Sequence, residues 1–206
     1  MSQAQALLDR SDPQRCEADE RRVLIKPCSW ERYQQLSALF PDNKSVRLTY
    51  IDGVLEIMSP VGERHERHKT TLGYFVEAYC QLKGQRYYGR GGFTLEQPAF
   101  AAGEPDESYC FGQDKPVPDL VIEVVITSEA LSKLPLYRAK GIAEVWICRL
   151  GHLQIHVLTA EGYAMAASSQ LLPGLDAECI DRCLAIPDQY DAVLAFRRII
   201  EDRGQV

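Results

Sequence analysis

The sequence predicts an α/β fold that contains a parallel pair of strands. A β-branched run at 120–126 is followed by a helical segment at about 132–141 and by a second apolar run at 144–148. A continuous apolar run is typical of a strand covered on both faces, and a strand, helix and strand within about thirty residues predict a crossover between parallel neighbours. A long amphipathic helix, predicted at about 64–83, is the third observation in favour of this class.

The first part of the chain contains a polar tail, a helix and a hairpin. Residues 1–22 are polar and charged with no sustained period, so we expect a flexible tail in front of a single domain at 23–206. Ser29 is a typical N-cap for the helix that follows it, and Asp52-Gly53 is a strong hairpin signal. The elements predicted here are a short strand at 23–27, a helix at 30–40 and two strands at 46–51 and 54–58.

The remaining elements surround the central unit. The helix at 64–83 carries an apolar stripe that includes Leu72, and His65 lies on the same side seven residues earlier. The elements predicted elsewhere are strand pieces at 85–88, 91–96 and 109–111, antiparallel strands at 153–158 and 163–167, a turn-rich segment at 171–184 and a last helix at about 188–201.

Two carboxylates accompany the apolar strand at 120–126. Asp119 and Glu123 lie on one face, because side chains alternate along a strand. A buried carboxylate needs a cation, hydrogen-bond donors or a metal as its partner. These two are about 13 Å apart at ~3.3 Å per residue, whereas ligands of Mg²⁺ lie ~2.1 Å from the ion. They cannot hold one ion together, so a co-ligand of Glu123 must come from a neighbouring strand, and the nearest candidate is Asp106.

Composition restricts the class of protein. The chain has 206 residues, 46% of them apolar, and a net charge of −6, which argues against nonspecific coating of nucleic acid without excluding a local basic cleft. Its seven cysteines form no C-x-x-C pair, so we expect mainly buried, reduced thiols of a cytoplasmic protein and no zinc or disulfide sites. We find no signal-peptide pattern and no segment long enough to span a membrane.

Four motifs occur in a characteristic order. They are YIDGVLEIMSP with a following histidine, PDESYCF, VPDLVIEVVITS and KLPLYRAKGIAEVWI. Together they resemble the Uma2-like family of the PD-(D/E)XK superfamily, over a stretch from about Trp30 to Asp176. The resemblance implies a restriction-endonuclease-like core, in which a central mixed sheet is flanked by helices. It also implies a site for Mg²⁺ (or Mn²⁺) made by carboxylates on adjacent strands.

The resemblance assigns three principal site residues. Asp106 would be the aspartate of the PD element, and Glu123 the acidic residue of the (D/E)XK element. Val125 stands where the lysine of that element would be, and Lys133, from the following helix, is the expected substitute. Its ammonium group would position a water molecule or balance the charge that develops on the phosphate.

Three further residues match the family. Glu56 and His65 match an acidic and a histidine position, where they could complete the metal shell or steer the phosphate. Asp119 matches as well, and the distance argument makes it a supporting group at the end of its strand.

The implied function is metal-assisted hydrolysis of phosphodiester bonds in DNA, by a protein that we expect to act as a homodimer. The alternative is a catalytically weak or inactive nuclease-fold protein that serves as a dimeric binding scaffold, which the acidic balance and the missing lysine at Val125 favour. Taken singly, the acids also have structural explanations: Asp106 fits a turn and Glu56 an exposed strand face.

Overall fold

The computed structural model describes residues 22–40, 46–58, 62–126 and 132–203, and within them the chain forms two β-sheets and five α-helices. The six-stranded sheet has the order β11 (Tyr163–Ala166), β10 (His152–Leu158), β9 (Glu144–Arg149), β8 (Leu120–Val125), β7 (Glu107–Phe111) and β4 (Tyr87–Gly89). The five-stranded sheet has the order β1 (Arg22–Ile25), β3 (Val54–Met58), β2 (Arg47–Ile51), β6 (Ala101–Gly103) and β5 (Leu95–Gln97).

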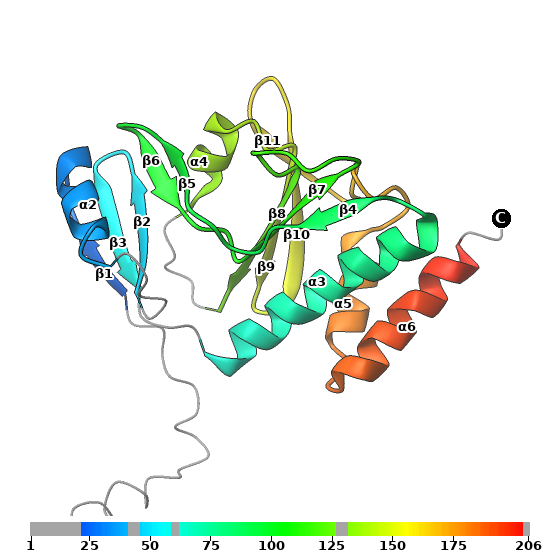
Figure 1. Ribbon diagram of the computed structural model, residues 1–206. Helices are drawn as coiled ribbons and strands as arrows, with labels where there is room; N and C mark the ends of the chain where they lie inside the picture. Colours follow the sequence, from blue (N-terminus) through cyan, green and yellow to red (C-terminus); the bar gives the residue numbers. More distant parts are fainter. Residues whose placement is uncertain (1–21, 41–45, 59–61, 127–131, 204–206) are drawn as a thin grey trace, which may run out of the picture.

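The helices are distributed unequally over the six-stranded sheet. Three of them, α3 (Glu63–Lys83), α5 (Ala177–Leu184) and α6 (Gln189–Asp202), gather on one side of it (Figure 1). The short helix α4 (Leu134–Ala139) lies on the other side, between the β5–β6 hairpin and β11 (Figure 1). The sheet is therefore covered by helices on both of its faces in the region of β8.

Strand β8 follows the predicted alternation and the predicted pairing. Leu120, Ile122 and Val124 belong to the core beneath the three helices, whereas Val121 packs with Leu136 of α4 in a second core. β8 and β9 are parallel, with Ile122 opposite Trp146, and the other pairs in this sheet are antiparallel. The prediction of an α/β fold with a mixed sheet flanked by helices is confirmed.

The five-stranded sheet is a feature that the sequence did not predict. Its hairpin, β2 and β3, is the one signalled by Asp52-Gly53, with Ile51 opposite Val54. Helix α2 (Trp30–Ser37) covers this sheet, and Tyr33 packs against Tyr50 with ring centroids 5.4 Å apart. The sheet is completed by β5 and β6, which lie about fifty residues further along the chain.

Several predicted boundaries need correction. Helix α2 ends at Ser37 and not at residue 40, and the crossover helix α4 has only six residues, preceded by Lys133 as its N-cap. The segment 171–184 contains helix α5. Its N-cap is Asp176, whose carboxylate accepts a hydrogen bond from the Cys179 N–H. Of the predicted tail, residues 1–21 lie outside the described residues, and Arg22 already belongs to β1.

Candidate active site

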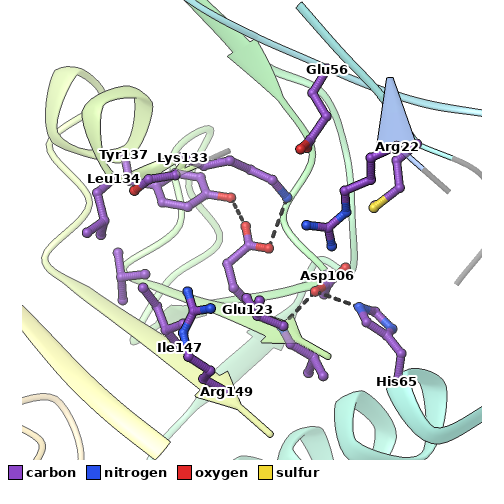
Figure 2. A pocket seen from close by; sticks show the side chains of 15 residues that line it. Arg22, Glu56, His65, Asp106, Glu123, Lys133, Leu134, Tyr137, Ile147 and Arg149 are labelled. Carbon is purple, nitrogen blue, oxygen red and sulfur yellow. Dashed lines mark hydrogen bonds and ion pairs between the residues drawn. The ribbon is translucent and has the colours of Figure 1, made fainter. Parts of the chain in front are cut away.

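A cavity of about 80 Å³ lies where the two sheets meet. Acidic and basic side chains from both sheets point toward it (Figure 2). The titratable residues that line it are Arg22, Glu56, His65, Asp106, Glu123, Lys133, Tyr137 and Arg149. Glu56, His65, Asp106 and Glu123 are each at most 8% exposed, so these four polar side chains are buried against the cavity wall.

Asp106 directly precedes β7, and Glu123 lies on the neighbouring strand β8. β7 and β8 are antiparallel with Glu107 opposite Ile122, so one further step of this register places Asp106 opposite Glu123. The backbone N–H of Val124 donates a hydrogen bond of 2.8 Å to Asp106 Oδ2. This bond fixes the Asp106 carboxylate at the edge of β8, beside the glutamate.

The Asp106 carboxylate is surrounded by donors. Arg47 of β2 donates to Oδ1, and the His65 Nε2 atom lies 3.1 Å from Oδ2. Burial alone would raise the pKa of Asp106, but the hydrogen bond from His65 and the positive charges of Lys133 and Arg47 outweigh it. The pKa of Asp106 is therefore held well below its ordinary value, and the group stays ionised at neutral pH.

Both oxygens of Glu123 are held by the segment that forms α4. Lys133 Nζ lies 2.9 Å from Oε2, and the Tyr137 hydroxyl donates a hydrogen bond to Oε1 (Figure 2). Burial raises the pKa of Glu123 and the nearby Asp106 carboxylate adds to this, while Lys133 and Tyr137 act in the opposite direction. The net pKa of Glu123 is raised, so the two neighbouring acids are shifted in opposite directions.

Lys133 connects the two sheets at the cavity. Besides its contact with Glu123 in the six-stranded sheet, its Nζ donates a hydrogen bond of 2.6 Å to the Glu104 carbonyl oxygen, just after β6 of the other sheet. Its stem runs past Gly103, where an added Cβ would lie 3.4 Å from Lys133 Cδ. A larger residue at 103 would crowd the lysine, so the small residues of β6 leave room for it.

The remaining predicted residues divide into two groups. Glu56 on β3 and His65 on α3 line the cavity with Asp106, Glu123 and Lys133, so the structure brings these five together. Asp119 does not line it. Its carboxylate binds the Lys115 ammonium and accepts a hydrogen bond of 2.8 Å from the Phe111 N–H, at the opposite end of β8.

Sequence reasoning missed Arg47 and Tyr137. Tyr137 follows Lys133 by four residues, which is one helical turn, so its position on the same face as Lys133 was visible in the sequence. Arg47, like Glu56, is a charged residue inside an apolar strand, and Arg47 and Glu56 lie on adjacent antiparallel strands. No local pattern pairs Arg47 with Asp106, since 59 residues separate them.

The donor chemistry of the cavity fits a hard divalent cation. Mg²⁺ prefers oxygen ligands and is usually bound by one or two carboxylates, with water and substrate phosphate completing its shell. Asp106 and Glu123 supply such a pair. Within the described ranges, no three His, Cys, Asp or Glu side chains are arranged to hold an ion together, so Glu56 does not form a three-ligand set with them in this arrangement.

Comparison with known proteins gives a family. A family model described as "Uma2: Putative restriction endonuclease" matches residues 30–184, which is most of the chain. No curated protein matches the chain. The mixed sheet and its helices agree with the restriction-endonuclease-like core that the resemblance implied. No helix in the described part of the chain is long and apolar enough to cross a membrane.

Proposed function

The chain belongs to the Uma2 family, and from this premise we propose that it is a divalent-metal-dependent endonuclease that hydrolyses phosphodiester bonds in DNA. The observation that carries the proposal is the meeting of Asp106, Glu123 and Lys133 at one buried cavity. An acid pair beside an ammonium group matches the requirements of phosphoryl transfer, in which charge on the phosphate must be balanced and a water molecule positioned.

In this proposal Asp106 and Glu123 hold Mg²⁺ or Mn²⁺. When bound, the ion would polarise the scissile phosphate and lower the pKa of a water molecule. The residues around the acids have separate tasks. His65 and the Val124 N–H orient the Asp106 carboxylate, and Tyr137 orients that of Glu123.

The basic groups of the cavity suit an anionic substrate. Lys133 can donate a hydrogen bond to a phosphate oxygen, and Arg22 and Arg149 line the same cavity. Three cationic side chains line the cavity together with the acids Glu56, Asp106 and Glu123, so positive charge balances the buried carboxylates at this place in a chain of net charge −6. We assign Glu56, on the wall formed by β3, an indirect contribution through a bridging water. We assign Asp119 a structural role, because it is bound to Lys115 outside the cavity.

A second candidate function is a nuclease-fold scaffold without catalytic activity. One observation favours it: all four carboxylate oxygens of Asp106 and Glu123 already have protein partners, two of which are the cations Arg47 and Lys133. Such neutralised acids can serve stability alone. We propose a homodimer for either function. In the nuclease, each copy would act on one strand of the DNA. Light scattering of the purified protein measures the mass and therefore the oligomeric state.

Cleavage of supercoiled plasmid separates the two candidates. We expect nicked and linear products in the presence of Mg²⁺ or Mn²⁺ and none with a chelator. The variants Glu123→Gln and Asp106→Asn should lose at least about a hundredfold in rate, as expected for groups that bind the catalytic ion. Asp119→Asn is the matched control, because it removes an acid at the other end of β8, outside the cavity.

Two outcomes would contradict the nuclease. Cleavage that survives both active-site substitutions would come from a contaminating enzyme, and no cleavage with either ion would favour the scaffold.

A further inference from the structure

A second hollow, of about 680 Å³, lies directly beside the candidate active site. It is formed by the outer surface of α4, by Phe100 in front of β6, and by Tyr163 at the start of β11. Ser132 and Leu134 line both this hollow and the catalytic cavity, so the two share a wall. A volume in the range of about 300–1,000 Å³ is typical of sites that take up organic groups.

The hollow combines aromatic walls with one cation. Phe100 and Tyr163 are half-buried, and Tyr163 is fixed by the hydrogen bond of 2.6 Å that its hydroxyl donates to the Ile142 carbonyl oxygen. Arg138 is exposed, and its guanidinium group lies against Gly162, where an added Cβ would be 3.3 Å from Nη1. The backbone at Gly162 therefore packs against the Arg138 guanidinium group.

Arg138 is not paired within the described part of the chain. Its side chain has no hydrogen bond or ion pair with any residue in the part of the chain that the structure describes. The Arg138 guanidinium can donate hydrogen bonds to an anion, and Phe100, Leu134 and Tyr163 beside it present apolar surface. A ligand that contacts both carries a negative charge and an apolar group, and a flat ring is the apolar group that stacks best on aromatic side chains.

We propose that this hollow binds a nucleotide of the substrate strand next to the scissile phosphate, with its unpaired base against Phe100 and Tyr163 and its phosphate on Arg138. The inference rests on the proposed function, since it takes the strand that enters the catalytic cavity as the ligand. A base can enter the hollow only when it is not stacked in a duplex, so we expect the nucleotide next to the cut to be unpaired, either in single-stranded DNA or at a locally opened site of a duplex.

Binding of fluorescein-labelled single-stranded DNA tests this proposal without cleavage, because anisotropy can be measured in the presence of a chelator. Arg138→Ala is compared with Lys140→Ala, which removes the same charge from the end of the same helix but lies outside the hollow, where Lys140 donates to the Glu96 carbonyl oxygen. We expect Arg138→Ala to weaken binding about tenfold and Lys140→Ala less than threefold.

An abasic site moved along the oligonucleotide tests the contact with the base. At one position in the oligonucleotide the abasic site should weaken binding to the unmodified protein about tenfold. At that same position it should not weaken binding to the Phe100→Leu variant any further, because the base contact is already lost there. Circular dichroism verifies that each variant is folded. Any of three results would overturn the proposal. Arg138→Ala and Lys140→Ala could weaken binding equally, the abasic site could weaken binding to Phe100→Leu as much as to the unmodified protein, or no oligonucleotide could bind.

The outcome is distinct from that of the plasmid experiment. Metal-dependent cleavage together with an unaltered affinity of Arg138→Ala would reject the nucleotide site alone. The predicted binding pattern without cleavage by any metal would reject the nuclease alone.

Discussion

Lys133 Nζ lies 2.9 Å from Glu123 Oε2, although Lys133 belongs to the segment after the strand that carries Glu123. The lysine of a (D/E)XK element would occupy position 125, two residues after the glutamate and on the same face of β8. Val125 stands there and lines the same cavity as Lys133. The ammonium group therefore reaches the glutamate from the residue that precedes α4, and not from β8.

The first prediction concerns this relocated lysine. Lys133→Met should reduce DNA cleavage by about 10²–10³, because it removes the charge that we assign to the phosphate. Adding Val125→Lys to that variant should restore part of the rate, since position 125 faces the same cavity. Plasmid cleavage rates at saturating Mg²⁺ measure both effects. Lys115→Met, which breaks a lysine–aspartate pair away from the cavity, serves as the control; an equal loss there would contradict the assignment.

The second prediction concerns the hydrogen bond between Tyr137 and Glu123. Tyr137→Phe leaves a buried carboxylate oxygen without its donor, which should lower the free energy of unfolding by about 1–3 kcal/mol. It should also weaken Mn²⁺ binding, because Glu123 is no longer held in one orientation. Chemical denaturation and calorimetry measure the two effects.

Tyr163→Phe is the matched control for Tyr137→Phe, since it removes a tyrosine hydroxyl that donates to a backbone carbonyl outside the cavity. It should lower stability and leave Mn²⁺ affinity unchanged. Unchanged Mn²⁺ affinity in Tyr137→Phe would show that the tyrosine has no positioning role.

The third prediction concerns acid stability. The pKa of Asp106 in the folded protein lies below its unfolded value of about 3.9, so this group contributes stability that is fully present above about pH 4. The contribution is lost as the pH falls through the folded pKa. The free energy of unfolding should therefore fall more steeply below pH 4 in the unmodified protein than in Asp106→Asn, by up to about 1.4 kcal/mol per pH unit. Urea unfolding between pH 2 and pH 7 measures this difference. The same pH dependence of the free energy of unfolding in the unmodified protein and in Asp106→Asn would contradict the prediction.

Local patterns predicted the central unit well. The alternation around Glu123, the parallel pairing of β8 with β9 and the hairpin at Asp52-Gly53 all depend on residues close in sequence, where strand period and turn chemistry apply. The distance limit required that a co-ligand of Glu123 come from a neighbouring strand, with Asp106 as the nearest candidate, and both side chains line the same cavity.

Long-range pairing was not predictable in the same way. Strand β6, with the sequence Ala-Ala-Gly, has no strand propensity of its own and exists because it pairs with β2, about fifty residues earlier. The contact of Arg47 with Asp106 depends on the same arrangement of the five-stranded sheet. The patterns of a single sequence report alternation within a strand, but they do not identify which distant strand becomes its neighbour.

The proposed function depends on Asp106 and Glu123 holding one divalent ion together, and a calorimetric titration of the metal-free protein with Mn²⁺ tests this most directly. We predict one strong site per chain, lost in both Asp106→Asn and Glu123→Gln and retained in Asp119→Asn. Two results would contradict the proposed function. One is binding of about one Mn²⁺ per chain with the same affinity in either active-site variant. The other is no Mn²⁺ binding to the unmodified protein, whether DNA is present or absent.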